Sequence, residues 1–420
     1  MSETDPMTID ERRKYLHKMW ERYRKGDRKE KGRLLDEMEL VTQMHRKALI
    51  RVLTGRLSRK RRSRERGPSY GARVADAVRI IVRSLDYPCA ERLKPSLVWM
   101  AKHLTKHQAM HIEAETLRKL DQISVSTLKR MLKKIGRPDA KLAFRKPART
   151  QRNHLRQAYP MRRIPWDIPE PGHFEVDLVV HSGQDSSGEF IHTIQIVDVA
   201  TGWSEIAAVY GRSYKVMQDG FQTILARLPF PIRELHPDNG AEFFNRHLLR
   251  FWQQEIVHLE LSRSRPYHKN DNRFVEENNH SLVRAYVGHG RLDTLAQLAT
   301  LRKLYQALWL YHNFFQPVMR THAKVFSDPL HYRRIFDPAK PPFDRLCERI
   351  TLPSEVLASL QRLRDQTNPI QLREQINMLI DQLWAAPTVQ RKSSVNVLYT
   401  LRKETDPPVT FSFEPSIPVR

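Results

Sequence analysis

The sequence contains little cysteine and no long apolar run. Only Cys89 and Cys347 occur in 420 residues, and they lie far apart. We therefore expect no disulfide framework, and a cysteine-based zinc site is excluded. No run of about 18 apolar residues is present, so no membrane-spanning helix is expected. The first 30 residues are crowded with charge and lack the apolar segment of a signal peptide, which favours a cytoplasmic protein without a membrane partner.

Charge is abundant and unevenly placed. The net charge is +25, of which +23 falls in residues 1–170 and only +2 in residues 171–420. A polycation of this kind is typical of proteins that bind nucleic acid, because each phosphate contact releases counterions. A solvated basic surface and a membrane-surface patch are the alternatives. We favour nucleic acid because the basic part precedes a candidate site for phosphodiester chemistry.

Residues 8–55 are predicted to be helical. Leu34, Leu35, Met38 and Val41 recur at helical spacing, and a second, basic helix ends before Gly55. Two short helices with a tight joint are typical of a helix-turn-helix, although an ordinary helical hairpin explains the segment as well. On the first interpretation, the second helix presents three basic residues to DNA, namely Arg46, Lys47 and Arg51.

A basic arm and a second helical region follow. Residues 56–66 carry seven basic residues in eleven, which suits an arm lying along phosphates; we single out Arg59, Lys60, Arg61 and Arg62. Residues 70–135 are predicted to be helical again. Ser124 is a plausible N-cap for a last helix that would present Lys129 and Arg130 to DNA. Residues 137–172 are rich in Arg, Lys and Pro and are predicted to form a basic linker.

Apolar patterns change from residue 173 onwards. Short β-type runs and helical spacings alternate to predict the order βββαβαβα, which makes an α/β core with a five-stranded mixed sheet. Three acids stand at informative places in it: Asp177 in an apolar strand, Asp238 in the turn after the fourth strand, and Glu276 on the last helix. A charge in an apolar strand is costly to bury unless it is paired or bound to a metal.

The most specific motif is PDNGAEF at residues 237–243, followed by RPYHKNDNRFVEENNHSLV at 265–283. Together with the order of elements, these motifs make the chain resemble a bacterial insertion-sequence transposase with the RNase H-like catalytic core of the retroviral integrase superfamily. The resemblance is clear over residues 170–325 and covers little beyond 335. It implies Asp177, Asp238 and Glu276 as the catalytic and metal-binding acids, with Glu277 as the alternative to Glu276.

The resemblance also implies a cofactor, partners and a reaction. Two Mg²⁺ or Mn²⁺ ions held by the three carboxylates would support cleavage at mobile-element ends and transfer of the 3′-hydroxyl to target DNA. A homo-oligomer assembled on DNA is expected, in the bacterial cytoplasm at the nucleoid. Five residues near the third acid are expected to contact DNA: Tyr267, Lys269, Asn272, His280 and Arg284.

Other interpretations stay open at this stage. A metal-dependent nuclease of the same fold would cut without joining, and a transposase-derived regulator would bind DNA without catalysis. Residues 352–384 are predicted to be helical with a break at Pro369, either for oligomerisation or for DNA contact. The predicted organisation is a helix-turn-helix region with its arm (1–66), a second such region (67–136), the linker (137–172), the catalytic core (173–325) and a mainly helical C-terminal region (326–420).

Overall fold

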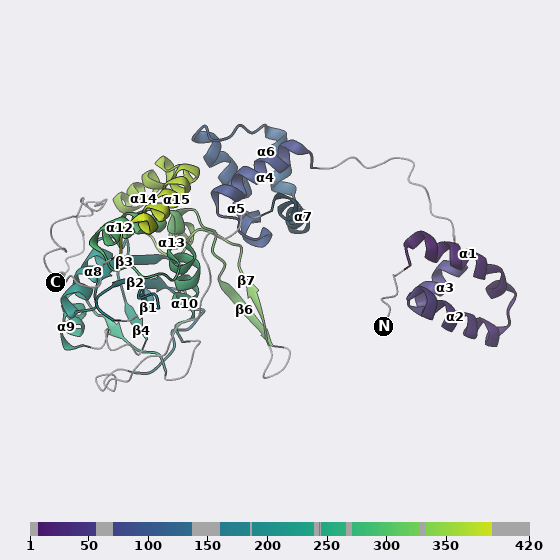
Figure 1. Ribbon diagram of the computed structural model, residues 1–420, viewed down its shortest axis with the longest axis horizontal. Coiled ribbons are helices and arrows are strands. Elements are labelled where there is room, and N and C mark those ends of the chain that lie inside the picture. Colours follow the sequence, from purple (N-terminus) through teal and green to yellow (C-terminus); the bar gives the residue numbers. More distant parts are fainter. Residues whose placement is uncertain are drawn as a thin grey trace. The chain divides into compact units, whose positions relative to one another are not determined.

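The computed structural model describes residues 7–55, 70–136, 160–184, 187–238, 243, 245–265, 271–326 and 332–388. The chain divides into two compact units, residues 1–69 and 70–420 (Figure 1). In the parts of the chain just named, no helix combines the length and the apolar character needed to cross a bilayer.

The first unit contains three helices, α1 (Ile9–Lys25), α2 (Arg28–Thr42) and α3 (Arg46–Thr54). Each begins where the sequence supplies a cap: Thr8 forms a capping box with Glu11, and Asp27 accepts the backbone N–H of Glu30. The helices enclose a small core of Leu16, Met19, Leu34, Leu35, Met38, Leu49 and Leu53. Val41, predicted to share the buried stripe of α2, is exposed instead.

The second unit begins with α4 (Ala72–Ser84), α5 (Ala90–Lys106), α6 (Ala114–Gln122) and α7 (Val125–Ile135). The predicted N-cap of α7 is confirmed, because Ser124 accepts the backbone N–H of Thr127. These helices do not form a separate body: Tyr311 donates its hydroxyl to the Ser84 carbonyl at 2.6 Å. Arg373 and Asp86 add an ion pair of 2.7 Å. The second helical region is therefore built into the same compact unit as the sheet.

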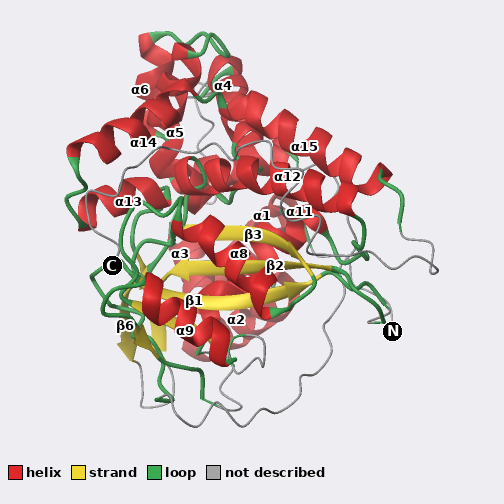
Figure 2. Cartoon of the chain, turned by 90° about the vertical axis from the view of Figure 1, so that its left-hand side faces the viewer, coloured by secondary structure: helices red, strands yellow, loops and turns green. Residues whose placement is uncertain are grey.

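The sheet has the order β3-β2-β1-β4-β5. Its strands are β1 (His173–Val180), β2 (Ile191–Asp198), β3 (Ser204–Tyr210), β4 (Glu234–Pro237) and β5 (Glu260–Leu261). The first three are antiparallel neighbours, whereas β4 and β5 run parallel to β1. This topology confirms the predicted α/β core with its five-stranded mixed sheet. Figure 2 shows β1, β2 and β3 side by side.

Helices cover the sheet as the apolar pattern predicts. They are α8 (Tyr214–Leu225), α9 (Arg246–Glu255), α10 (Arg273–Asn278), a π-helical turn η2 (Asn279–Arg284), α11 (Ala285–Val287) and α12 (Leu295–Phe314). Alternation along β1 separates two environments. Phe174 stacks on Phe230, which in turn contacts Trp203 beside α12. Glu175, the next residue, faces α10. Trp203 and Trp252 are core residues.

The C-terminal part is mainly helical, as predicted, with α13 (Pro342–Arg349), α14 (Ser354–Gln366) and α15 (Pro369–Ala385). Pro369 begins α15, which confirms the predicted break. The apolar side of α15 packs along α12 and reaches α4, so it is used inside the chain. One feature was not predicted: β6 (Thr321–Phe326) and β7 (Tyr332–Phe336) form a separate two-stranded ribbon.

Candidate active site

The parallel pairing of β1 and β4 brings two of the candidate acids next to each other. Val176 on β1 is in register with Pro237, the last residue of β4. The residue that follows each of them in the chain is an aspartate, Asp177 within β1 and Asp238 just after β4. Adjacent strands lie roughly 4.8 Å apart, so these two backbone positions are neighbours at the carboxyl end of β4. On its other side, Asp177 is paired with the buried Gln195 of β2.

The helix that carries the third acid is fastened to β1 by Glu175. Glu175 Oε2 accepts the backbone N–H groups of Phe274 and Val275 at 2.7 and 2.9 Å. Asn272, at the N-cap position of α10, makes no side-chain capping bond. The carboxyl group from the strand therefore takes the place of a local cap. Burial raises the pKa of Glu175 to about 8, against the opposing effect of the two N–H donors.

A second link joins the same helix to Asp177 itself. The side-chain amide of Asn279, the first residue of η2, donates to Asp177 Oδ2. Asn279 lies three residues after Glu276, so the two side chains share one helical face. Asp177 is half-buried and also accepts the N–H of Leu178 at 2.8 Å through Oδ1, whereas Glu276 is exposed.

The side chains of Asp177, Asp238 and Glu276 are not placed around one shared metal position. Among the residues that the structure describes, which include all three acids, no group of three His, Cys, Asp or Glu side chains is placed to hold a metal ion. The donor chemistry suits a hard divalent cation, because all the candidate ligands are carboxylate oxygens. The elements thus bring the acids to one region of the sheet, and the side chains as placed do not form a finished metal centre.

Comparison with known proteins identifies a relative. The chain is 35% identical over 322 residues to the uncharacterized protein y4rM of Sinorhizobium fredii, which covers 76% of this chain and 91% of y4rM. The chain belongs to the y4rM family. No protein-family model matches it.

Two solved structures resemble this member of the y4rM family. One is the catalytic core domain of BIV integrase, which is 13% identical and covers 42% of this chain and 94% of that one, with a TM-score of 0.29. The other is a simian T-cell lymphotropic virus intasome in complex with PP2A regulatory subunit B56 gamma. It is 12% identical and covers 53% of this chain and 71% of that one, also with a TM-score of 0.29.

Glu277, the alternative third acid, points elsewhere. Its carboxylate lies 3.7 Å from the Arg92 guanidinium of α5. It also lines a pocket with Tyr286, His312 and Arg320, on a different side of the helix from Asn279. Since Asn279 faces Asp177, the position of Glu276 fits the candidate site better than that of Glu277.

The basic residues predicted to bind DNA have different surroundings. Lys47 and Arg51 are exposed on α3, and Lys129 and Arg130 are exposed on α7. Arg46 pairs with Asp36 and donates to the Gly32 carbonyl at 3.2 Å, which ties α3 to α2. For all of these residues, DNA contact stays a prediction. Four predicted residues of the basic arm, Arg59, Lys60, Arg61 and Arg62, lie outside the described residues.

The residues predicted to contact DNA near the third acid also differ from one another in their surroundings. Tyr267 and Lys269 lie outside the described residues. Asn272 is 5% exposed, and neither polar atom of its amide has a hydrogen-bond partner within the part of the chain that the structure describes. Arg284 donates to the Val180 carbonyl at 2.8 Å and to the Gly288 carbonyl at 3.0 Å, which fastens η2 to the end of β1. His280 is exposed one turn after Glu276.

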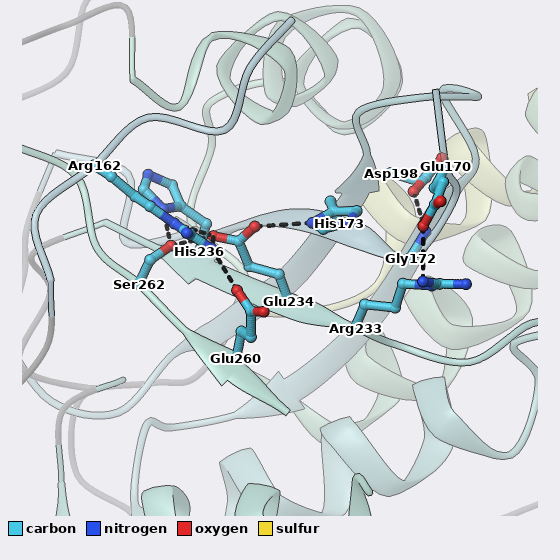
Figure 3. A network of polar contacts seen from close by, with 10 residues as sticks. All are labelled: Arg162, Glu170, Gly172, His173, Asp198, Arg233, Glu234, His236, Glu260 and Ser262. Carbon is cyan, nitrogen blue, oxygen red and sulfur yellow. Dashed lines mark hydrogen bonds and ion pairs between the residues drawn. The ribbon is translucent and has the colours of Figure 1, made fainter. Parts of the chain in front are cut away.

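A buried polar network, which sequence reasoning missed, holds β4 in place (Figure 3). The Glu234 carboxylate contacts His173 Nδ1 at 2.9 Å, accepts the Ser262 hydroxyl at 2.5 Å and lies 2.9 Å from an Arg162 nitrogen. Burial by itself would raise the pKa of Glu234, but these three partners lower it to about 2. Burial lowers the pKa of the neighbouring His236 to about 4, so this imidazole is neutral at pH 7.

The same network corrects the extent of the predicted linker. Arg162 and the buried Ile164 lie within the predicted 137–172 segment, yet they pack on the sheet and on Phe274 of α10. Arg162 also reaches Glu260 of β5 at 2.7 Å. Asp198, at the end of β2, caps the following turn by accepting the N–H of Thr201 at 2.7 Å. Glu175 could have been found from the sequence, because it lies two residues before Asp177 and so shares its face.

Proposed function

We propose that this protein is a DDE-type DNA strand-transfer enzyme that cuts at the ends of a mobile element and joins them to target DNA. The observation that carries the proposal is the register of β1 and β4, which makes Asp177 and Asp238 neighbours. The hydrogen bonds of Glu175 and Asn279 support it further, because they fasten the helix of Glu276 to the same strand. The PDNGAEF motif around Asp238 adds the resemblance of sequence.

The carboxylates would act through divalent cations. Asp177, Asp238 and Glu276 would hold two Mg²⁺ or Mn²⁺ ions, which supply activation of an attacking hydroxyl and stabilisation of a leaving oxygen. Two neighbouring side chains position the candidate ligands. Glu175 sets where α10 begins, and Asn279 orients the Asp177 carboxylate. For the three carboxylates to bind the same cations, the Glu276 side chain must rotate toward β1. Because this side chain is exposed, it is able to change rotamer.

DNA is the proposed partner, and its charge explains the basic N-terminal part. The exposed Lys47, Arg51, Lys129 and Arg130 are proposed to contact phosphates, along with the basic arm at 56–66. Joining two element ends to one target needs more than one copy of the chain, so a homo-oligomer on DNA belongs to the same proposal.

A strand-transfer assay tests the proposal. The full chain is incubated with labelled element ends, target DNA and Mg²⁺ or Mn²⁺, and cleaved and joined products are separated on a gel. The matched variants are Asp177→Asn and Asp219→Asn, the second on α8 with a carboxylate 3.9 Å from Arg302. We expect Asp177→Asn to abolish both products and to keep DNA binding, whereas Asp219→Asn keeps both. Undiminished joining by Asp177→Asn would remove Asp177 from the site.

A non-catalytic DNA-binding protein is the second candidate. The observation in its favour is that the carboxylates, as placed among the described residues, do not form a metal-holding group. The same assay separates the candidates. Cleavage without joining would indicate a metal-dependent nuclease, and DNA binding without either product would indicate a regulator.

A further inference from the structure

The β6–β7 ribbon has no role in the proposed function. Its two strands pair only with each other among the described strands, and Figure 1 shows them standing apart from the five-stranded sheet. An isolated two-stranded hairpin is only marginally stable in water. The base of the ribbon is nevertheless fixed: Asp337 accepts the N–H of Arg320 at 2.8 Å and pairs with Arg345, which is 2% exposed.

The pairing register sorts the ribbon into two faces. Lys324 lies opposite Arg334, and Val325 lies opposite Arg333. Directly opposed residues share a face and successive residues alternate, so Lys324 and Arg334 lie on one face and Arg333 on the other. The Lys324 ammonium is 4.6 Å from the Trp166 ring. The Lys324/Arg334 face is therefore turned toward the segment that precedes β1.

Two further cations stand beside that face. The Arg273 guanidinium, at the start of α10, lies 4.3 Å from the Phe274 ring, and Phe274 belongs to the same apolar cluster as Trp166. Burial lowers the pKa of Arg273, and the nearby positive charges of Arg163 and Arg334 lower it further. The carboxyl groups of Glu175 and Glu277 act in the opposite direction. One terminal nitrogen of Arg273 is buried and has no hydrogen-bond acceptor among the described residues.

We propose that Lys324 and Arg334 of the ribbon, with Arg163 and Arg273, form a cradle for the phosphate backbone of duplex DNA next to the helix of Glu276. A polyanion relieves the repulsion among gathered cations and supplies an acceptor for the buried nitrogen of Arg273. The described strands of the ribbon contain Lys324, Arg333 and Arg334 and no acidic residue. The proposal rests on the proposed function for the choice of DNA, because the cradle adjoins the candidate phosphodiester site.

An acidic protein surface is the competing occupant, and the exposed apolar residues Val325 and Ile335 would suit it. They lie on the opposite face of the ribbon from Lys324 and Arg334, however, and so do not line the cradle. Backbone phosphates require only cations at suitable positions, which is what the cradle provides.

Binding of a 30-base-pair duplex to the full chain tests the cradle. Fluorescence anisotropy is measured in EDTA, so no cleavage occurs, over a series of salt concentrations. Each lost phosphate contact reduces the magnitude of the negative slope of log Kobs against log[salt] by about 0.9. We expect the double variant Lys324→Ala/Arg334→Ala to reduce this magnitude by about two, and Arg333→Ala, on the other face, to leave it unchanged. Lys324→Arg/Arg334→Lys, which keeps the charges, should retain the wild-type slope.

Two results would overturn the cradle: an unchanged slope in the double alanine variant, or an equal loss in Arg333→Ala. Circular dichroism recognises a double alanine variant that fails to fold. In that case the cradle is tested by Lys324→Arg/Arg334→Lys and by Arg163→Ala. We expect Arg163→Ala to reduce the magnitude of the salt-dependence slope by about one. The test is independent of catalysis. A wild-type chain that lacks strand transfer but shows the predicted slopes would refute the proposed function and leave the cradle standing.

Discussion

The carboxyl group of Glu175 accepts the backbone N–H of Val275 at 2.9 Å, so a residue of β1 caps the helix that carries Glu276. Asp177 lies two residues further along the same strand. One short stretch of β1 therefore supplies a candidate metal ligand, Asp177, and also sets where α10, the helix that carries the candidate ligand Glu276, begins. A local cap at Asn272 would fix the start of α10 without fixing its position against the sheet. Capping from the strand does both.

Removing this cap should destabilise the protein. Glu175→Ala leaves two buried N–H groups without an acceptor, and each costs about 1–3 kcal/mol. We expect the free energy of unfolding to fall by roughly 3 kcal/mol in Glu175→Ala and by under about 1 kcal/mol in Glu175→Gln, whose amide oxygen can accept both donors. Urea unfolding followed by near-UV circular dichroism measures this difference. Glu255→Ala, exposed at the end of α9, is the control; an equal loss there would argue against a specific cap.

The third acid can be assigned by comparing adjacent glutamates. Glu276 shares a helical face with Asn279, whereas Glu277 lies 3.7 Å from Arg92 and lines a pocket. We expect Glu276→Gln to lower the rate of strand transfer at least 10³-fold, in the range by which catalytic residues contribute. Glu277→Gln should stay within about fivefold of the wild type, because an exposed ion pair contributes under about 1 kcal/mol. The measurement is the initial rate of joining, and the reverse order would move the third acid to Glu277.

The sequence predicts the core well because its strands and helices bury regular apolar patterns. The apolar run around Asp177 forms a strand, as its pattern predicts, and the stripe of Leu298, Leu301, Tyr305 and Leu308 on α12 is buried. The candidate acids could be chosen for the same reason, since each stands at a definite point of a predictable element.

The unpredicted features depend on contacts between distant residues. Those side chains of the β6–β7 ribbon that the structure describes belong to no apolar core, so the strands show no clear alternation of apolar and polar residues. The Glu175 cap joins residues 100 positions apart in the chain. The placement of Arg162 on Glu234 is likewise invisible to local patterns, because a stretch rich in Arg and Pro has the composition of a linker.

Acidification should selectively weaken the Glu234 network. The folded pKa is about 2 and the ordinary value is 4.5, so the depressed pKa stabilises the fold above pH 4.5 and this contribution disappears as pH falls toward 2. A shift of that size corresponds to about 3 kcal/mol. Glu234→Gln should therefore cost up to about 3 kcal/mol at pH 7 and progressively less below pH 4.5, as measured by urea unfolding at several pH values. Glu260→Gln is the control, because its exposed carboxylate contacts the same arginine and should contribute under about 1 kcal/mol. A cost for Glu234→Gln that is independent of pH would show that packing, not charge, accounts for it.

Truncation at the boundary between the compact units should separate DNA binding from stability. The first unit ends at residue 69 and has its own core, so we expect the second unit to fold without it. We expect the truncated chain to keep the thermal midpoint of the second unit and to bind DNA more weakly and with a smaller salt dependence. Differential scanning calorimetry and a gel-shift salt titration measure the two effects.

A cut at residue 135 should behave differently, because it removes Ser84 and Asp86, the residues that Tyr311 and Arg373 contact. That deletion exposes apolar surface of α12 and α15 and should lower the midpoint by several degrees. Equal midpoints for the two truncations would mean that the second helical region is dispensable for the fold.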